Sequence, residues 1–367
     1  MVKLGEVCLI NPKSCTLRDD TEVSFIPMTK VGEHGEFDAS EIKNYSEVKK
    51  GFTNFQNGDI LFAKITPCME NGKGAIAHNM KNGIGFGSTE FHVLRPDTDK
   101  ITSEWLYYLT TWKAFRKEAE RNMTGSAGQK RVPKTFLENY VVNLPDIDTQ
   151  KSENKILRKV DDFIFLRKQQ LAKLDELVKA RFVEMFGDPV SNPMGWKRVR
   201  FDSISENLDS KRVPVTESDR KDGVYPYYGA SGIVDWINDY IFDEDILLVS
   251  EDGANLLMRS TPIAFSVSGK SWVNNHAHVV RFHDFATQKF IEVYFSLIDI
   301  SEYITGTAQP KLNQAKLNTM LFCWPPLSLQ KQFAAFVERV DQQKQTIQQS
   351  LEKLELMKKA LMQEYFG

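Results

Sequence analysis

The chain has almost no net charge. Its 367 residues include 47 Lys and Arg against 49 Asp and Glu, which gives a formal charge of −2. A protein that coats nucleic acid regardless of sequence is usually strongly basic, so this balance excludes that class. Binding through local basic patches stays open. Hydrophobic residues make up 41% and charged residues 26%, which is ordinary for a globular chain of two or three domains.

Cysteine and long apolar runs are also scarce. The four cysteines are scattered and form no C-x-x-C pair, so neither a disulfide framework nor a cysteine zinc site is expected. No apolar run approaches the roughly 20 residues that a membrane-spanning helix needs. The apolar run in the first ten residues is too short and too broken for a signal peptide. We therefore expect a cytoplasmic protein that has no membrane partner.

Motifs for catalysis and cofactor binding are missing as well. Gly269-Lys270-Ser271 matches the end of a phosphate-binding loop, but Ala264 stands where that motif needs its first glycine. His276 and His278 could supply two ligands from one strand, and two ligands do not complete a zinc site. The sequence therefore predicts no catalytic residue, no metal site and no cofactor in this chain.

The sequence does contain an internal repeat. Residues 137–187 align without a gap to residues 317–367. The matched pairs include Leu137/Leu317, Pro145/Pro325, Gln150/Gln330, Val160/Val340, Leu171/Leu351 and Phe186/Phe366. Upstream, Gly125-Ser126-Ala127 resembles Gly306-Thr307-Ala308, and residues 58–62 resemble residues 244–248. A repeat of this length predicts two copies of one structural unit.

Each copy is expected to begin with a mixed α/β domain. Short β-like runs punctuated by Gly, Pro and Asn are typical of strands; examples are residues 60–62, 91–94, 246–249 and 279–282. A Pro-bearing turn then leads into a long helix in each copy. The predicted organisation is α+β, with globular domains over residues 1–145 and 188–325 and helical regions over residues 146–187 and 326–367.

Both helical regions carry apolar residues at heptad spacing, which is typical of a coiled coil. Basic residues interrupt each seam, namely Arg167, Arg181, Lys344 and Lys358. The predicted seam residues are Leu157, Val160, Ile164, Leu171, Leu174, Val178 and Met185 in the first helix, and Val337, Val340, Ile347, Leu351, Leu354, Leu361 and Tyr365 in the second.

Two helices of equal length in one chain are natural partners for each other. We expect an antiparallel coiled coil that relates the two copies by a pseudo-twofold axis. About 35 helical residues span roughly 50 Å, more than one turn of duplex DNA at about 34 Å. The alternative is that each helix packs only on its own domain.

Several motifs, taken in order and in duplicate, resemble one family. They are residues 125–133, Leu144-Pro145 and Pro325-Pro326-Leu327 before the helices, Phe186-Gly187-Asp188-Pro189, and the strand-like residues 87–91 and 272–278. Together with the doubled layout they resemble the specificity subunit of type I restriction–modification systems over the full chain. The resemblance implies two target-recognition domains separated by the helical regions.

The same resemblance implies a non-catalytic subunit of a larger enzyme. Each recognition domain would read one half of a bipartite site in double-stranded DNA. The helices would set the half-site spacing and dock two modification subunits, which are DNA adenine methyltransferases. S-adenosylmethionine and ATP are then expected on partner subunits, and restriction or translocase subunits are further candidate partners.

Candidate DNA-binding residues follow from the chemistry of readout. Lys and Arg contact phosphates, and Arg, Lys, Asn and Gln read base edges. The candidates near loops are Lys64, Asn71, Lys73, Ser88, Thr89, Gln129, Lys130 and Arg131 in the first domain, and Lys270, Asn274, Asn275, Gln309 and Lys311 in the second. In both copies a glutamine is followed closely by a basic residue, over residues 129–131 and 309–311, and we call this segment the Gln/basic loop. It is the strongest candidate because both copies retain it.

Two other classes remain open from the sequence. One is a stand-alone sequence-specific DNA-binding protein, or the specificity portion of a split modification enzyme. The other is a structural coiled-coil adaptor without DNA binding, which the near-neutral charge permits.

Overall fold

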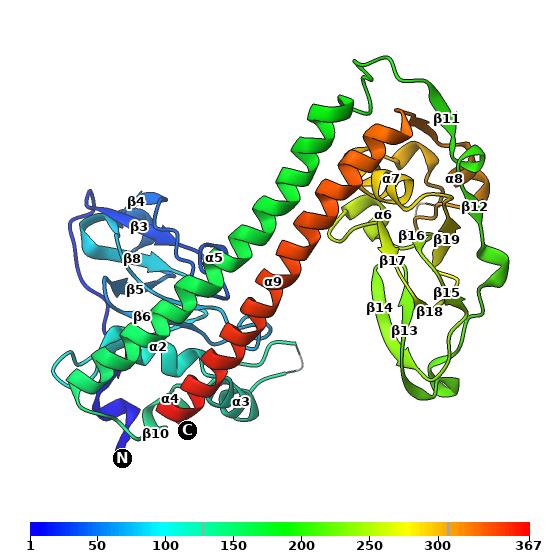
Figure 1. Cartoon of the computed structure of the whole chain (residues 1–367). Coiled ribbons are helices and arrows are strands. Elements are labelled where there is room, and N and C mark those ends of the chain that lie inside the picture. Colours follow the sequence, from blue (N-terminus) through cyan, green and yellow to red (C-terminus); the bar gives the residue numbers. More distant parts are fainter. Residues whose placement is uncertain (127, 307–308) are drawn as a thin grey trace. The chain divides into compact units, whose positions relative to one another are not determined.

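The computed structural model describes residues 1–126, 128–306 and 309–367, and these divide into two compact units (Figure 1). Unit 1 comprises Met1–Leu166 and Leu351–Gly367, and unit 2 comprises Arg167–Ser350. Each unit therefore contains one globular domain together with parts of both long helices. No helix in the described part of the chain combines the length and the apolar character that crossing a membrane requires.

The domain of unit 1 is built from short strands and several helices. In chain order the elements are β1 (Val2–Lys3), η1 (Leu4–Glu6), β2 (Cys8–Ile10), β3 (Glu22–Ile26), η2 (Met28–Lys30), β4 (Ile42–Asn44), α1 (Tyr45–Val48), β5 (Thr53–Gln56), β6 (Ile60–Ala63), β7 (Gly74–Ile76), η3 (Lys81–Gly83), β8 (Ile84–Gly87), β9 (Phe91–Pro96), α2 (Ser103–Thr111), α3 (Lys113–Arg121), α4 (Lys134–Asn139) and β10 (Val141–Val142). Helix α5 (Ile147–Phe186) follows.

The domain of unit 2 begins after α5. Its elements are β11 (Arg198–Arg200), η4 (Phe201–Ser203), β12 (Glu206–Asn207), η5 (Asp209–Lys211), η6 (Glu217–Asp219), β13 (Asp222–Gly229), β14 (Gly232–Ile237), β15 (Phe242–Asp243), β16 (Ile246–Ser250), α6 (Asn255–Met258), β17 (Ala264–Val267), β18 (Lys270–Val273), β19 (Ala277–Arg281), α7 (Phe285–Leu297), η7 (Ser301–Tyr303), α8 (Gln314–Thr319) and β20 (Leu321–Cys323). Helix α9 (Leu327–Phe366) ends the described structure.

The two domains share one sheet topology. The strand orders β2-β9-β6-β7, β4-β3-β8-β5 and β1-β10 in unit 1 recur as β12-β19-β16-β17, β14-β13-β18-β15 and β11-β20 in unit 2. The parallel pair β3/β8 has its equivalent in β13/β18. This agreement confirms the predicted α+β repeat, and it provides structural equivalences between domains whose sequences differ widely.

The strands at the centre of each domain are buried on both faces. Ile60 and Phe62 of β6 pack against the helices of unit 1, while Leu61 points to the second sheet. Leu247 of β16 likewise packs with α7 and the long helices, and Leu248 faces the second sheet. Side chains alternate between the faces of a strand, so a strand covered on both faces needs a continuous apolar run.

Each long helix is anchored at its start by a buried glutamine. Gln150 accepts a hydrogen bond from the Thr102 backbone N–H and donates to the carbonyls of Lys100 and Pro145, each at 2.9 Å. Its repeat equivalent, Gln330, donates to Pro325 O at 2.9 Å and accepts from Thr287 at 2.8 Å. Both glutamines are 0% exposed, so each helix is fixed to its own domain.

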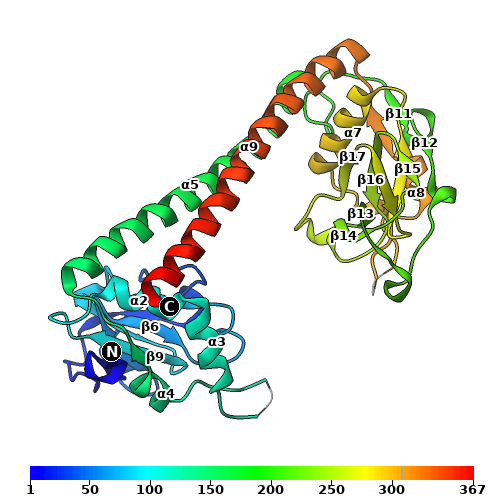
Figure 2. The same ribbon diagram turned by 60° about the horizontal axis from the view of Figure 1, so that its bottom comes forward.

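The long helices also pack against each other within each unit, as the views in Figures 1 and 2 agree. In unit 1, Leu157 and Met362 share a buried cluster, and Lys358 forms an ion pair with Asp161 at 2.5 Å. In unit 2, Lys344 pairs with Asp175. The spacing from Asp161 to Asp175 equals that from Lys344 to Lys358, as an antiparallel register requires. The predicted antiparallel coiled coil is confirmed.

The structure buries or half-buries every predicted seam residue. The basic interruptions of the seam all have partners. Lys344 and Lys358 pair with aspartates of the other helix, Arg167 donates to Ser350 at 3.3 Å, and Arg181 pairs with Glu184 at 2.8 Å. Each helix has 40 residues, which corresponds to about 60 Å rather than the 50 Å expected from the sequence.

Candidate nucleic-acid interface

Backbone hydrogen bonds gather three distant segments at one edge of unit 1. Lys64 N–H donates to Glu90 O at 2.9 Å, Val132 N–H donates to Lys64 O at 2.9 Å, and Thr66 N–H donates to Lys130 O at 3.0 Å. We call residues 64–66, 88–90 and 129–131 the loop edge of unit 1. Backbone hydrogen bonds therefore hold these three segments together at the ends of β6 and β9.

Unit 2 contains the same set of bonds. Glu251 N–H donates to His276 O at 2.9 Å, Leu312 N–H donates to Glu251 O at 2.8 Å, and Gly253 N–H donates to Pro310 O at 3.0 Å. Residues 251–253, 274–276 and 309–311 form the loop edge of unit 2. The backbone of the basic residue in the Gln/basic loop is held in the same way in both units. Arg131 forms two backbone hydrogen bonds with Thr124, and Lys311 forms two with Thr305.

A buried histidine supports each loop edge. His92 Nε2 donates to Val132 O at 2.7 Å, and His278 Nε2 donates to Leu312 O at 2.7 Å. In unit 1 the other ring nitrogen lies 3.0 Å from Asn11 Nδ2, which donates to it, so the ring is neutral. Burial lowers the pKa of His92, which agrees with a neutral ring.

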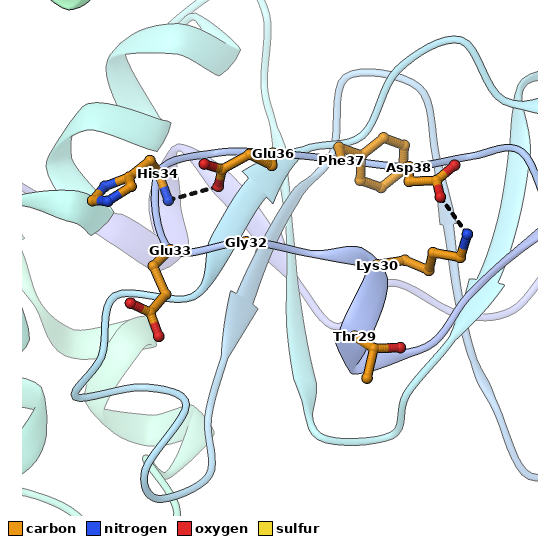
Figure 3. Close-up of a pocket in the computed structure, with 8 residues that line it drawn as sticks. All are labelled: Thr29, Lys30, Gly32, Glu33, His34, Glu36, Phe37 and Asp38. Carbon is orange, nitrogen blue, oxygen red and sulfur yellow. Dashed lines mark hydrogen bonds and ion pairs between the residues drawn. The ribbon is translucent and has the colours of Figure 1, made fainter. Parts of the chain in front are cut away.

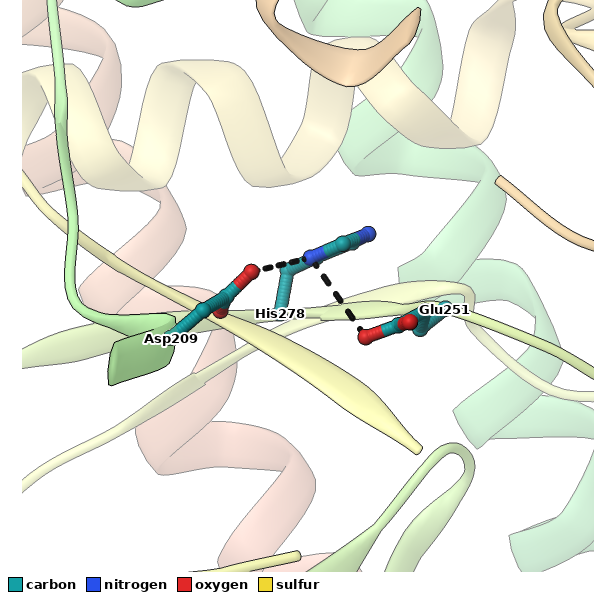
Figure 4. Close-up of side chains that lie close together, drawn as sticks. All are labelled: Asp209, Glu251 and His278. Carbon is teal, nitrogen blue, oxygen red and sulfur yellow. Dashed lines mark hydrogen bonds and ion pairs between the residues drawn. The ribbon is translucent and has the colours of Figure 1, made fainter. Parts of the chain in front are cut away.

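The same position in unit 2 carries a charged network. His278 Nδ1 lies 2.6 Å from Asp209, which replaces Asn11, so both ring nitrogens face oxygen acceptors (Figure 4). Burial raises the pKa of Glu251, but hydrogen bonds from Arg212 and Lys311 outweigh it and hold the pKa below its usual range.

Asp209, Glu251 and His278 could in principle hold a metal ion, because their ligand atoms lie within 4.8 Å of one another. However, the positive charges that contact these carboxylates belong to the side chains of Arg212 and Lys311. Arg212 NH1 lies 2.7 Å from Glu251, and Lys311 Nζ lies 3.0 Å from Glu251. Since His92 occupies the same place in unit 1 beside the neutral Asn11, we interpret the cluster as a support for the loop edge.

The predicted DNA-binding residues of unit 1 lie on or beside its loop edge. Asn71, Thr89, Gln129 and Lys130 are exposed, and Lys64, Lys73, Ser88 and Arg131 are half-buried. Three of them have structural contacts. Lys73 donates to Met28 O at 3.3 Å, and Ser88 Oγ accepts from the Glu90 N–H at 3.2 Å. Arg131 forms a bidentate pair with Glu90, each bond at 2.9 Å.

Unit 2 gathers all but one of its predicted residues. Asn275, Gln309 and Lys311 are exposed at the loop edge, whereas Asn274 is buried and accepts from the His276 N–H at 2.8 Å. Lys270 stands at the end of β18 that is away from the loop edge, about 13 Å along the strand from Asn274. Its ammonium lies 4.5 Å from the Tyr240 ring centre.

Part of the predicted loop cannot be compared. Ala127, Thr307 and Ala308, which belong to the repeated Gly-Ser/Thr-Ala segments, lie outside the described residues.

Sequence reasoning missed Glu90, Asp252 and His276 as members of the loop edges. Glu90 pairs with Arg131, and His276 Nδ1 lies 2.9 Å from Asp252. The resemblance upstream of the gap-free repeat pairs Arg131 with Lys311, but nothing in the sequence aligns Glu90 with His276. The equivalence comes from their backbone carbonyls, which accept the same ladder bond.

A shallow hollow of about 500 Å³ lies beside residues 29–38 of unit 1 (Figure 3). Lys30 and Asp38 form an ion pair at one side, and Glu36 accepts from the His34 backbone N–H at 2.9 Å at the other. These bonds close the local hairpin that begins at the bridge between Val31 and Phe37. The charged groups serve the hairpin, and we assign no ligand to the hollow.

Comparison with known proteins places the chain in a family. A family model described as the type I restriction modification DNA specificity domain matches residues 1–176 and again residues 193–356. The chain belongs to this family, as the sequence motifs indicated.

Curated relatives agree with the family. The chain is 48% identical over 158 residues to the specificity subunit of the type I restriction enzyme EcoAI from Escherichia coli, which covers 42% of this chain and 26% of that subunit. It is 44% identical over 147 residues to the EcoEI specificity subunit from Escherichia coli, covering 39% of this chain and 24% of that subunit. The match thus spans about a quarter of each relative.

Solved structures show a similar fold over nearly the whole chain. The S subunit of a type I restriction–modification system from M. genitalium superposes with a TM-score of 0.62 at 13% identity, covering 100% of this chain and 95% of that one. A chain from a study of assembly and conformational transition of the type I R-M system gives 0.55 at 16% identity, with 99% and 96% covered.

Proposed function

We propose that this chain is the non-catalytic DNA-specificity subunit of a type I restriction–modification enzyme, and that each domain binds one half of a bipartite DNA site through its loop edge. The observation that carries the proposal is the duplicated loop edge, in which one hydrogen-bonded frame presents polar and basic side chains in both units. Membership of the specificity family supports it.

Within each loop edge the Gln/basic loop is the proposed phosphate contact. Gln129 and Lys130 are exposed, and no contact of the Lys130 ammonium is found among the described residues. Arg131 is held by Glu90 at 2.9 Å, so its guanidinium is already partly neutralised. Lys130 is therefore expected to contribute more than Arg131 to binding that depends on salt.

The long helices are the proposed docking surface for modification subunits. Apolar side chains stay exposed on both helices: in unit 1, Phe163 is 53% and Leu356 is 67% exposed, and in unit 2, Leu177 is 47% exposed. A groove of about 820 Å³ in unit 2 runs between the helices and is lined by Leu177, Ala180 and Phe336 among others. Exposed apolar surface of this kind is typical of protein interfaces.

Those partners would supply the chemistry. S-adenosylmethionine and the methyl-transfer site would lie on the two modification subunits, and ATP on restriction or translocase subunits where the system has them. The complex, and not this chain, would then be the DNA adenine methyltransferase and endonuclease. We also propose that the complex works in the cytoplasm.

Two measurements test the proposal. Co-purification from the source cell should yield modification subunits, and DNA binding should strengthen greatly when they are present. Tight, sequence-specific binding by the chain alone would instead favour a stand-alone DNA-binding protein. Absence of DNA binding in both states would favour a structural adaptor.

A salt titration of the complex tests the phosphate contact. Lys130→Ala with Arg131→Ala should weaken binding to every DNA sequence and reduce the slope of log K against log salt by about one for each phosphate that is no longer bound. The single Lys130→Ala variant should account for most of that change. Lys50→Ala, at an exposed lysine outside the loop edge and the long helices, is the control. A slope that stays the same in the double variant would exclude the loop from phosphate binding.

A further inference from the structure

The two loop edges agree in some residues and differ in others. The features that they share are the ladder bonds, the buried histidine, and a basic loop residue, Arg131 or Lys311, that pairs with a glutamate. If the two units read different half-sites, shared features suit the phosphate backbone, which has the same chemistry everywhere. Residues that read bases should occupy equivalent positions and differ in chemistry.

Among the equivalent positions of the loop edges that differ in chemistry, one carries a solvent-accessible side chain with an ionic partner in both units. Glu90 in unit 1 and His276 in unit 2 are equivalent, because their carbonyls accept from Lys64 N–H and Glu251 N–H respectively, each at 2.9 Å. Both side chains reach the surface, with 27% and 50% exposed. A carboxylate occupies the position in one unit and an imidazole in the other.

Each of these side chains is held in place by an ionic partner. Arg131 Nε and NH2 donate to the two oxygens of Glu90 at 2.9 Å. Asp252, which is 14% exposed, lies 2.9 and 3.0 Å from His276 Nδ1. The His276 backbone is fixed too, since its N–H donates to Asn274 Oδ1 at 2.8 Å. Little conformational freedom is left to lose on binding.

The chemistry of each pair leaves polar atoms that can read a base. A carboxylate held on one side by arginine keeps lone pairs that accept from the amino group of cytosine or adenine in the major groove. The Nδ1–H of His276 donates to Asp252, which fixes the ring. No hydrogen bond of His276 Nε2 is found among the described residues, so this atom can bond to a base edge.

We infer that Glu90 and His276 are equivalent base-reading residues, each reading one base pair of its own half-site, with Arg131 and Asp252 as their positioning residues. The inference rests on the proposed function, because it names specificity-determining residues of the same DNA interface. It assigns sequence readout to one defined position of the shared frame, and it predicts that the two half-sites differ at the base pair that this position reads.

Mapping of methylated sites in cells tests the inference on the whole complex. The specificity chain is produced with its modification subunits, and modified bases are located by sequencing for wild type, Glu90→Gln and His276→Gln. Glu90→Gln should reduce discrimination at one base pair of one half-site by about tenfold and leave the other half-site unchanged. His276→Gln should do the same in the other half-site. His283→Gln, at an exposed histidine outside the loop edge, should leave both unchanged.

A second variant separates readout from misfolding. Asp252→Asn keeps the size of the positioning residue but removes its charge, and it should affect the same base pair as His276→Gln. Unchanged sequence preference in both single variants would overturn the inference, as would loss of methylation at every site in both His276→Gln and Asp252→Asn. Wild-type cells that show no methylation at any bipartite site would instead refute the proposed function.

Discussion

A single residue sets the polar partner of the buried histidine behind each loop edge. Asn11 donates to Nδ1 of His92 in unit 1, and Asp209 accepts from Nδ1 of His278 in unit 2. The exchange of an amide for a carboxylate places a charged partner beside the histidine of unit 2. Arg212 and Lys311 then balance the carboxylates around it. The same backbone frame is thus supported by neutral hydrogen bonds in one unit and by ion pairs in the other.

This difference makes His92 a source of pH dependence. Burial lowers the pKa of His92 below its ordinary value of 6.5. Protonation therefore favours the unfolded state, so the stability from the neutral ring is fully present above about pH 6.5 and is lost as the pH falls through the lowered pKa. His92→Gln should be less stable than wild type at about pH 8, and its melting temperature should fall less between about pH 7 and 5.

The check is thermal unfolding of the full chain over that pH range. His283→Gln, which removes an exposed histidine, should keep the wild-type pH profile. Parallel profiles for wild type and His92→Gln would show that the ring does not titrate with folding.

At the scale of elements, the long helices were the most predictable part of the chain. Their heptad seam is a local pattern that does not depend on distant residues, and every predicted seam residue is at least half-buried. The loop edges were less predictable, because they depend on bonds between segments far apart in the sequence, such as Lys64 with Glu90 and Val132. Composition alone placed Lys270 among the candidates, although its position at the other end of β18 separates it from Asn274.

The glutamine at the start of each long helix gives a prediction at this scale. Gln150→Ala removes three hydrogen bonds of a fully buried side chain and leaves the backbone groups of Lys100, Thr102 and Pro145 without these partners. We expect a loss of about 1–3 kcal/mol in the free energy of unfolding, measured by urea denaturation of the full chain. Gln169→Ala on the exposed face of α5 should change it little. A Gln150→Ala variant as stable as wild type would mean that the helix needs no anchor there.

At the scale of the whole molecule, the repeat divides two tasks between different parts of one chain. The helical regions repeat without a gap, and each unit uses one antiparallel pairing with an aspartate–lysine pair across it. The domains repeat in topology and in the hydrogen-bonded frame of the loop edges, but they differ at side chains such as Glu90 and His276. This division suits the proposed function, in which a spacer and docking surface would be equivalent for two identical partners and two readers of unlike half-sites would differ.

If the helices are the spacer, their length should set the distance between the half-sites. The test is a variant with seven residues inserted into each long helix, after Leu166 and after Ser350, where the chain passes between the units. An insertion of seven residues preserves the heptad seam. It would lengthen each helix by about 10 Å, which corresponds to about three base pairs of duplex. Methylated-site mapping should then show the same two half-sites separated by a longer spacer, with Gln169→Ala retaining the original one. The original spacer in the lengthened protein would mean that contacts made by partner subunits, and not these helices, fix the spacing.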